Sequence, residues 1–438
     1  MTVRPGRPTE TAGSSVQRAR SLSLVDAIGI GVNGIVGSGV YLLVAPLAAV
    51  GGGASALGVI ACGVLCVLIA LCFAELSSMF DRSGGPYVYA REAFGSVIGF
   101  GVGWFGMATG ILGLAAVSVG FAGALARFVP AAAAARVPIA VGLICALGGI
   151  NYLGVKAGGR TSTLLSVVKI APLALLALLG LRFVSFENIH LGFQPIVRSA
   201  FLAIFMMSGF EYAAVPAGEV RDAKRAVPLA IVGSLAFACL LYAALQLVSV
   251  GALPDLSQRE QPLPDVAALL FPQGARIIGI TAVISMAGFC SSVALIAPRY
   301  FLALAEDGYL PKILTRSSRH QTPGAAILTS TAFASGLAIL LGYASLVDVA
   351  NVVILSGYAL TSLACLVLRF RLPDTPRRYR LPFGPLIPLL ATCSAFALLI
   401  SARPRAAEFI FSGELLAIGF AAWLATRLLR RVLASRRW

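Results

Sequence analysis

The stretch Ile28–Pro46, IGIGVNGIVGSGVYLLVAP, decides the fold. It is apolar and carries no charge, yet it contains the five glycines Gly29, Gly31, Gly34, Gly37 and Gly39. A helix that crosses a bilayer needs roughly 20 mostly apolar residues. Each glycine inside such a helix costs up to about 1 kcal/mol relative to alanine. The stretch therefore predicts a membrane helix that is interrupted near Gly37, Ser38 and Gly39.

The composition of the whole chain agrees with a membrane protein. Of 438 residues, 58% are hydrophobic and only 12% are charged, and the mean hydropathy is +0.91. Soluble domains carry about 25% charged residues. The net charge of +16 comes from Lys and Arg that lie mostly between apolar runs, not in one basic domain. This distribution excludes a nucleic-acid binder and predicts an all-α protein embedded in a lipid bilayer.

Apolar runs divide the chain into about twelve predicted spans. They lie near 24–49, 54–79, 96–127, 137–155, 161–181, 196–219, 227–251, 276–304, 324–341, 346–368, 384–402 and 408–427. With the N-terminus inside, Lys and Arg favour the cytoplasmic segments by about three to one, which is a positive-inside bias. We therefore expect a multi-pass protein of the cell membrane with both termini in the cytoplasm.

The predicted spans group into two halves of five helices each. We expect a flexible cytoplasmic tail over 1–21, a first repeat over 22–182, a second repeat over 196–370, two further helices over 384–427 and a basic tail over 428–438. The sixth span carries Ser208, Gly209, Phe210 and Glu211 in the middle of an apolar run. Interrupted spans at corresponding places of two halves are typical of a transporter binding site. The alternative is close helix packing through small residues.

The two predicted breaks suit a zwitterion. Gly37, Ser38 and Gly39 would offer backbone N–H groups and a hydroxyl to a carboxylate, because the N-terminus of a helix attracts anions. The carbonyls that end the first half of span six would face an ammonium group. An α-amino acid carries both charges a few ångströms apart.

Two charged residues lie deep in predicted spans. Lys169 follows Arg160 by nine residues, or roughly 14 Å along a helix, and a charge at that depth is costly unless it is paired or hydrated. Lys169 is either a coupling group or a structural lysine bonded to carbonyls of the break in span one. Glu211 is either a proton-sensing gate or a carboxylate bonded to loop backbone.

Other polar residues have less specific interpretations. Glu75 and Glu219 are expected to pair with Arg or Lys of loops, and Arg299 is expected to end span eight within the same charge network. Phe205 precedes Ser208 by one turn and is either a packing residue or a lid over the substrate.

The sequence shows no sign of an enzyme. The two histidines, His190 and His320, lie in predicted loops without a nucleophile nearby, and the cysteines lack metal-ligand spacing. No P-loop pattern is present, and the glycine-rich span does not follow a strand. We expect no cofactor, no metal and no nucleic-acid partner, and the sequence does not indicate the oligomeric state.

Four segments resemble signatures of the amino acid–polyamine–organocation (APC) superfamily. They are IGVNGIVGSGVYLLVAP from Ile30, FAELSSMFDRSGGPYVYAREAFG from Phe73, GFEYAAVPAGEVRDAKRAVP from Gly209 and PRYFLALAEDGYLP from Pro298. The resemblance covers about residues 20–330 in the right order. It implies the 5+5 inverted-repeat fold of the leucine symporters, with discontinuous helices 1 and 6.

The resemblance also implies roles for single residues. The substrate site would comprise Ile35, Gly37, Ser38, Gly39, Phe205, Ser208, Gly209, Glu211 and Ser292, with Lys169, Glu211 and Phe205 in coupling or gating. Lys169 matches the span-five lysine that replaces sodium in proton-coupled relatives. The branch that exchanges arginine for agmatine has aromatics at two positions that are Gly106 and Ser292 here. A stacked guanidinium is therefore not expected.

We expect a secondary-active amino acid transporter that works by alternating access, driven by protons or by exchange. The alternatives are an amino acid/polyamine antiporter and a non-transporting amino-acid receptor of the same fold.

Overall fold

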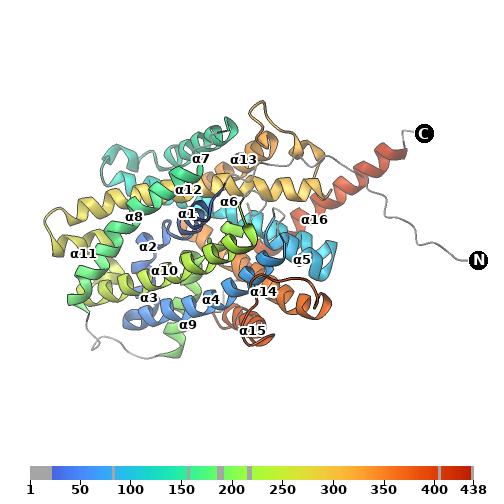
Figure 1. The fold of residues 1–438 in the computed structure, drawn as a ribbon. Coiled ribbons are helices and arrows are strands. Elements are labelled where there is room, and N and C mark those ends of the chain that lie inside the picture. Colours follow the sequence, from blue (N-terminus) through green and yellow to red (C-terminus); the bar gives the residue numbers. More distant parts are fainter. Residues whose placement is uncertain are drawn as a thin grey trace, which may run out of the picture.

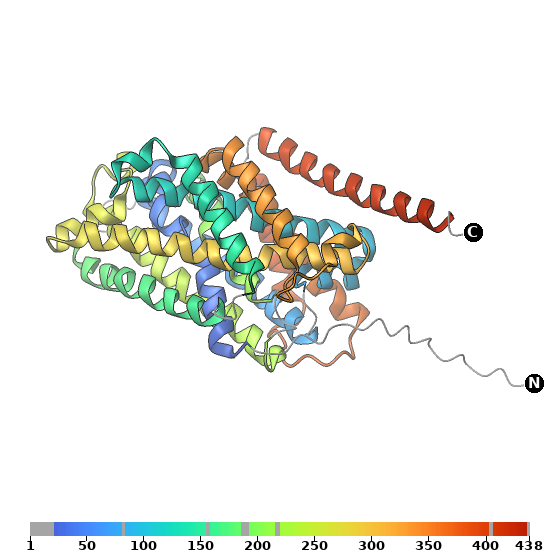
Figure 2. The same ribbon diagram turned by 90° about the horizontal axis from the view of Figure 1, so that it is seen from above.

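A computed structural model of the chain describes residues 22–80, 84–154, 158–184, 192–214, 220–402 and 406–435. Over these residues the backbone is helical, and β pairing is limited to one isolated bridge between Leu22 and Val220. Most of the long helices run side by side in one bundle (Figure 1). Seen from above, the last helix, α16 (Ala406–Ser435), lies along the outside of this bundle (Figure 2).

Helices occupy all the apolar runs that the sequence predicted, within a few residues at most ends. The helices of the first part are α1 (Leu24–Ile35), α2 (Gly39–Leu42), α3 (Val44–Gly51), α4 (Ser55–Met79), α5 (Pro86–Phe94), α6 (Ser96–Ala126), α7 (Arg136–Tyr152) and α8 (Gly158–Gly180). Those that follow are α9 (Phe193–Met207), η4 (Phe210–Ala214), α10 (Ala223–Ala252), α11 (Pro262–Leu270), α12 (Gly274–Glu306), α13 (Gly324–Leu340), α14 (Tyr343–Arg371), α15 (Leu386–Ser401) and α16. The short helices α5 and α11 lie between apolar runs and were not predicted.

The length and apolar character of the helices fit a membrane. Among the described residues, eight helical segments are long and apolar enough to cross one, and α7, α13 and α15 are shorter apolar helices. Large apolar side chains are exposed on the outside of the bundle, for example Leu240 (74%), Leu340 (77%) and Ile400 (73%). Such a surface is not stable in water but matches hydrocarbon.

Two helices are interrupted at the places that the sequence predicted. α1 begins with a capping box, in which Ser23 and Asp26 bond each other's backbone N–H groups, and it ends at Ile35. The chain then leaves the helix over residues 36–38 before α2 begins at Gly39. α9 ends at Met207 and continues after Ser208 and Gly209 as the 3-10 helix η4.

Glycines bring the two interrupted helices into backbone contact. A Cβ placed on Gly209, whose φ is +109°, would lie 2.0 Å from the carbonyl oxygen of Gly34. A Cβ placed on Gly39 would lie 2.7 Å from the Cα of Met206. The sequence left open whether the glycines mark a helix break or close packing. In the structure they do both, because the two breaks approach each other only where side chains are absent.

Candidate functional site

The break in α1 leaves three carbonyl groups without helical partners, and side chains from three other helices bond them. The carbonyl of Ile35 accepts from the Tyr242 hydroxyl of α10 at 3.1 Å. The carbonyl of Val36 accepts from the Lys169 Nζ of α8 and, at 3.0 Å, from the Ser285 Oγ of α12. Ser285 also reaches the carbonyl oxygen of Gly37 at 3.3 Å. The interrupted backbone is therefore stabilised by donors, one of which is cationic.

Lys169 is the cationic donor and is completely buried near the middle of α8. Its hydrogen bond to the Val36 carbonyl is 2.5 Å long, and within the described part of the chain no carboxylate forms an ion pair with it. This contact agrees with one of the two alternatives from the sequence, in which Lys169 bonds a carbonyl of the break in α1.

Beyond these carbonyls, the break in α1 presents N–H groups. Among the described residues, no acceptor is assigned to the backbone N–H of Ser38 or of Gly39. The Ser38 side chain is 1% exposed, and its Oγ lies 3.2 Å from the hydroxyl of Tyr343 at the start of α14. Two N–H groups and a hydroxyl thus lie together in the interior, as an anion site requires.

The break in α9 is stabilised by an acidic side chain of its own segment. One carboxylate oxygen of Glu211, Oε2, accepts from the backbone N–H of Gly209 at 2.9 Å and from the Tyr358 hydroxyl of α14 at 2.8 Å. Ser208 turns its hydroxyl back to the carbonyl of Phe205, 2.9 Å away, and so closes the end of α9. The Ser208 hydroxyl therefore does not point across to the break in α1.

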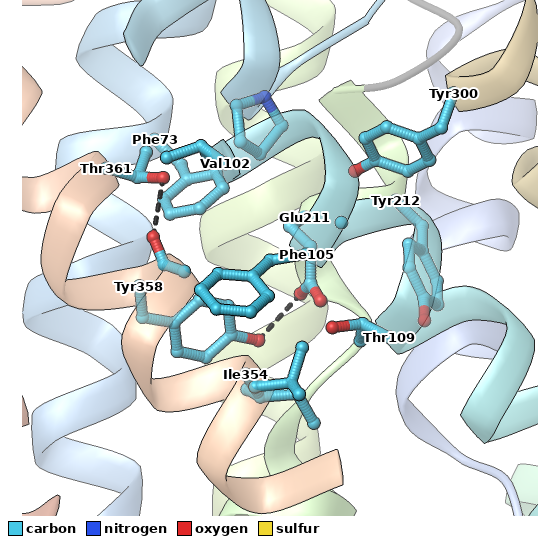
Figure 3. A pocket seen from close by; sticks show the side chains of 14 residues that line it. Phe73, Val102, Phe105, Thr109, Glu211, Tyr212, Tyr300, Ile354, Tyr358 and Thr361 are labelled. Carbon is cyan, nitrogen blue, oxygen red and sulfur yellow. Dashed lines mark hydrogen bonds between the residues drawn. The ribbon is translucent and has the colours of Figure 1, made fainter. Parts of the chain in front are cut away.

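A small cavity, with a volume of about 20 Å³, adjoins Glu211. Its walls are largely aromatic, as Figure 3 shows, and Thr109 adds a hydroxyl close to the Glu211 carboxylate. The aromatic residues that line it are Phe73, Phe105, Tyr212, Tyr300 and Tyr358. Of the predicted site residues, only Glu211 belongs to the lining; Ile35, Gly37, Ser38, Gly39 and Phe205 lie outside it.

The side of the site near Gly37 is filled by side chains. A Cβ on Gly37 would lie 2.8 Å from the ring of Phe289 in α12. The ring of Phe205 meets the ring of Tyr343 edge-on, with 6.4 Å between centroids. The Ser292 hydroxyl is buried and has no hydrogen-bond partner among the described residues. The break in α1 is thus closed off from the cavity at Glu211.

The charge network expected near the ends of spans two and eight is partly confirmed. Glu75, which is 1% exposed, forms ion pairs with Arg369 in the last turn of α14 and, at 3.3 Å, with Arg377 in the following loop. The expectation that Arg299 ends the helix was wrong. α12 continues to Glu306, seven residues beyond it, and Arg299 lines a different cavity near the ends of α7 and α13. Glu219 and His190 lie outside the described residues.

Several residues at the breaks were missed by sequence reasoning. Tyr343 and Tyr358 lie more than 100 residues in sequence from the side chains that their hydroxyls bond, and nothing in the sequence of α14 indicates those partners. The place left by Gly106 is taken by the Tyr300 ring, 2.7 Å from where a Cβ would be. Phe289 supplies an aromatic ring to the site one turn before Ser292. Both aromatic residues belong to α12, so rings lie near the site although Gly106 and Ser292 are not aromatic.

Comparison of the sequence with known proteins identifies its family. The sequence model described as amino acid permease matches residues 22–423. The chain is 28% identical over 413 residues to the methylthioribose transporter of Bacillus subtilis, which covers 88% of this chain and 89% of that protein. It is 26% identical over 445 residues to the branched-chain amino acid permease of the same organism, with 95% and 93% covered.

A plant relative extends the range of the comparison. The vacuolar cationic amino acid transporter 4 of Arabidopsis thaliana is 28% identical over 389 residues, which cover 82% of this chain and 64% of that protein. The family match covers both interrupted helices, the buried lysine and the buried glutamate described above. The chain belongs to the amino acid permease family, within the APC superfamily, and is a multi-pass membrane transporter of that family.

Proposed function

We propose that this chain moves amino acids across the cell membrane by alternating access around the breaks in α1 and α9. The observation that carries the proposal is the backbone contact of the two breaks, Gly34 against Gly209, beside the N–H groups of Ser38 and Gly39. Broken helices at membrane depth are tolerated where protein encloses them, and there they serve as ion and substrate sites.

The substrate's α-carboxylate would bind at Ser38 and Gly39. Both N–H groups point from the N-terminal end of a helical segment, and the Ser38 hydroxyl adds a donor. The α-ammonium group would bind at the end of α9, where the carbonyls of the last turn have no N–H partner from a following turn of the helix. The side chain would lie toward α12, where the Ser292 hydroxyl supplies a polar contact.

Protons are the proposed coupling ion. Lys169 occupies the position of a bound cation at the Val36 carbonyl, and Glu211 contacts the cavity on one side and the Gly209 backbone on the other. A change in protonation at either residue would alter the hydrogen bonds that hold a break. Transport would then respond to pH through the geometry of the breaks.

The arrangement of helices supports a twelve-span transporter of the plasma membrane. The eight membrane-length segments, the three shorter apolar helices and α8 would make twelve crossings, with 22–182 and 196–370 as inverted repeats. The positive-inside bias would place both termini in the cytoplasm. The relatives' names include a branched-chain and a cationic amino acid transporter, so the proposal extends to amino acids as a class.

Uptake into proteoliposomes tests the proposal. The full-length protein is reconstituted, and labelled neutral, cationic and acidic amino acids are offered with and without an inward pH gradient. We expect uptake of at least one amino acid, accelerated by the gradient. The matched control is Ser38→Trp, which fills the carboxylate site and should abolish binding while the protein still folds. Undiminished binding by this variant would remove the site assignment.

The same assay separates the alternatives. An antiporter would need amino acid or polyamine inside the vesicles and would respond little to the gradient. A receptor of the same fold would bind an amino acid without moving it. Binding with no flux under any loading condition would therefore refute transport while leaving the site intact.

A further inference from the structure

Tyr343 lies where the outer end of α14 meets both interrupted helices. It is the first residue of α14, and its hydroxyl lies 3.2 Å from the Oγ of Ser38. Its ring meets that of Phe205, the third residue from the end of α9, edge-on. One side chain thus contacts the break in α1 and the last turn of α9. No pattern in the sequence predicted this contact.

The surroundings of Tyr343 are closed by α6. A Cβ on Gly120 would lie 2.9 Å from Leu42, 3.5 Å from the Tyr343 ring and 3.6 Å from the Cβ of Ser38. A methyl group at 120 would displace the end of the Leu42 side chain, so α6 packs closely against these three residues. Ser38, Leu42, Gly120, Phe205 and Tyr343 therefore form one packed cluster, which we call the outer cluster.

The outer cluster lies at the first residue of α14, whereas the Glu211 cavity adjoins the middle of this helix. Tyr343 and Tyr358 are fifteen residues apart in a continuous helix, which corresponds to roughly 22 Å. Tyr358 bonds Glu211 at the cavity, whereas Tyr343 bonds Ser38 at the closed side. Tyr343 therefore contacts the break in α1 from the start of α14, and Tyr358 contacts the break in α9 from the middle of the same helix.

We propose that the Tyr343 hydroxyl is the latch of the outer gate, and that it closes the gate by bonding Ser38. This inference rests on the proposed function, because Ser38 is also the hydroxyl that would bind a substrate carboxylate. In this proposal Ser38 donates to the Tyr343 hydroxyl, so a carboxylate that accepts the same Ser38 proton competes with Tyr343 for it. Substrate arriving from outside thus requires the latch to open, and the empty site closes again when Tyr343 returns to Ser38.

Hydrogen–deuterium exchange tests the latch without any ligand. Full-length protein in lipid nanodiscs is compared with Tyr343→Phe, which keeps the ring and removes the hydroxyl. We expect backbone amides of residues 36–47 to exchange roughly two- to tenfold faster in the variant, the range that one neutral hydrogen bond allows. The control Tyr379→Phe makes the same chemical change in the loop after α14, far from the breaks, and should leave this segment unchanged.

A double-mutant comparison shows whether the latch acts through Ser38. Ser38→Ala alone should accelerate exchange as Tyr343→Phe does, and the two together should add nothing further. Unchanged exchange in Tyr343→Phe would overturn the proposal. A full additional effect of Tyr343→Phe in the Ser38→Ala background would also overturn it, since Tyr343 would then act through another group.

Binding measurements separate this proposal from the proposed function. Leucine and arginine serve as a neutral and a cationic probe, and Tyr343→Phe should bind the accepted probe up to about tenfold more tightly, because the competing hydrogen bond is gone. If binding is instead weaker than in the unmodified protein, the hydroxyl is not a competitor and the latch is refuted. If transport assays fail for every amino acid, the exchange experiment still decides whether Tyr343 holds Ser38.

Discussion

The break in α1 and the break in α9 are each bonded by a charged side chain, and the two charges are opposite. At the first break, the carbonyls of Ile35 and Val36 accept from Tyr242, Lys169 and Ser285. At the second, the N–H of Gly209 donates to the carboxylate of Glu211. A buried polar group without a partner is costly, so each break depends on the side chains that reach it.

The origin of those side chains also differs. The donors at the break in α1 come from α8, α10 and α12, so this break is held by three helices that are distant in sequence. Glu211 belongs to the broken helix itself and follows Gly209 by two residues. The break in α9 is thus largely local, with Tyr358 as its contact from another helix. A motion of α8 or α12 relative to α1 would change the first break more than the second.

The largest expected effect comes from the contact between the breaks. Gly209→Ala would place a methyl group 2.0 Å from the Gly34 carbonyl oxygen at a φ of +109°. Backbone strain and steric overlap together should destabilise the protein by more than about 3 kcal/mol. We expect little folded protein by size-exclusion chromatography and no uptake.

A matched glycine provides the control for this variant. Gly233 lies in α10, and a Cβ there meets nothing within 4 Å. Gly233→Ala should fold normally and melt at the same or a higher temperature, since alanine favours a helix. If Gly209→Ala also folded and transported normally, the contact between the breaks would not be required.

Lys169→Met tests whether the break in α1 depends on its cation. Methionine keeps an apolar stem of similar shape but leaves the Val36 carbonyl with only Ser285 as a donor. We expect a loss of roughly 1–3 kcal/mol of stability and a transport rate that no longer responds to a pH gradient. The measurements are the thermal unfolding midpoint in detergent and uptake across a pH series.

The control for Lys169 is a lysine outside the helices of the site. Lys312 is exposed in the short segment Lys312–Thr315, so Lys312→Met should change stability by less than about 0.5 kcal/mol. An unaltered melting temperature together with an unaltered pH response in Lys169→Met would show that Lys169 neither holds the break nor couples transport.

The difference between the breaks also explains what the sequence could predict. Glycine density marked the break in α1, and Glu211 lies close enough to Gly209 in sequence to be assigned to the second break. The other contacts depend on how separate helices are rotated against each other. Tyr343, Tyr358 and Phe289 look like ordinary aromatic residues of apolar helices until the helices are packed. Arg299 was placed at the end of a helix that in fact continues to Glu306.

Glu211→Gln is expected to affect pH dependence more than stability. The amide retains an oxygen for the Gly209 N–H and a polar partner for Tyr358, so the fold should lose no more than about 1 kcal/mol. Glutamine does not titrate, so the part of the pH profile that originates at this carboxylate should disappear. Transport measured at several pH values on both sides of the vesicle checks this.

A variant that removes Tyr358, the hydrogen-bond partner of Glu211, complements the Glu211→Gln experiment. Tyr358→Phe deletes the 2.8 Å hydrogen bond but leaves the carboxylate able to titrate. It should lower stability slightly and keep a pH-dependent rate. A profile in Glu211→Gln that matched the unmodified protein would assign the pH response elsewhere and leave Glu211 with a structural role.

Substitutions of two serines in α12 should have the smallest effects on stability. Comparing them distinguishes a serine that stabilises a break from one that contacts the substrate. Ser285 donates to the carbonyls at the break, so Ser285→Ala should cost about 1 kcal/mol. Ser292, two turns further along, has no partner among the described residues, so Ser292→Ala should leave the melting temperature nearly unchanged. A substrate contact at Ser292 would then appear only as weaker amino acid binding. If Ser285→Ala instead left the melting temperature unchanged, the hydrogen bond from Lys169 would be sufficient to stabilise the break in α1. The Ser285 hydroxyl would then contribute less than its two contacts with the break indicate.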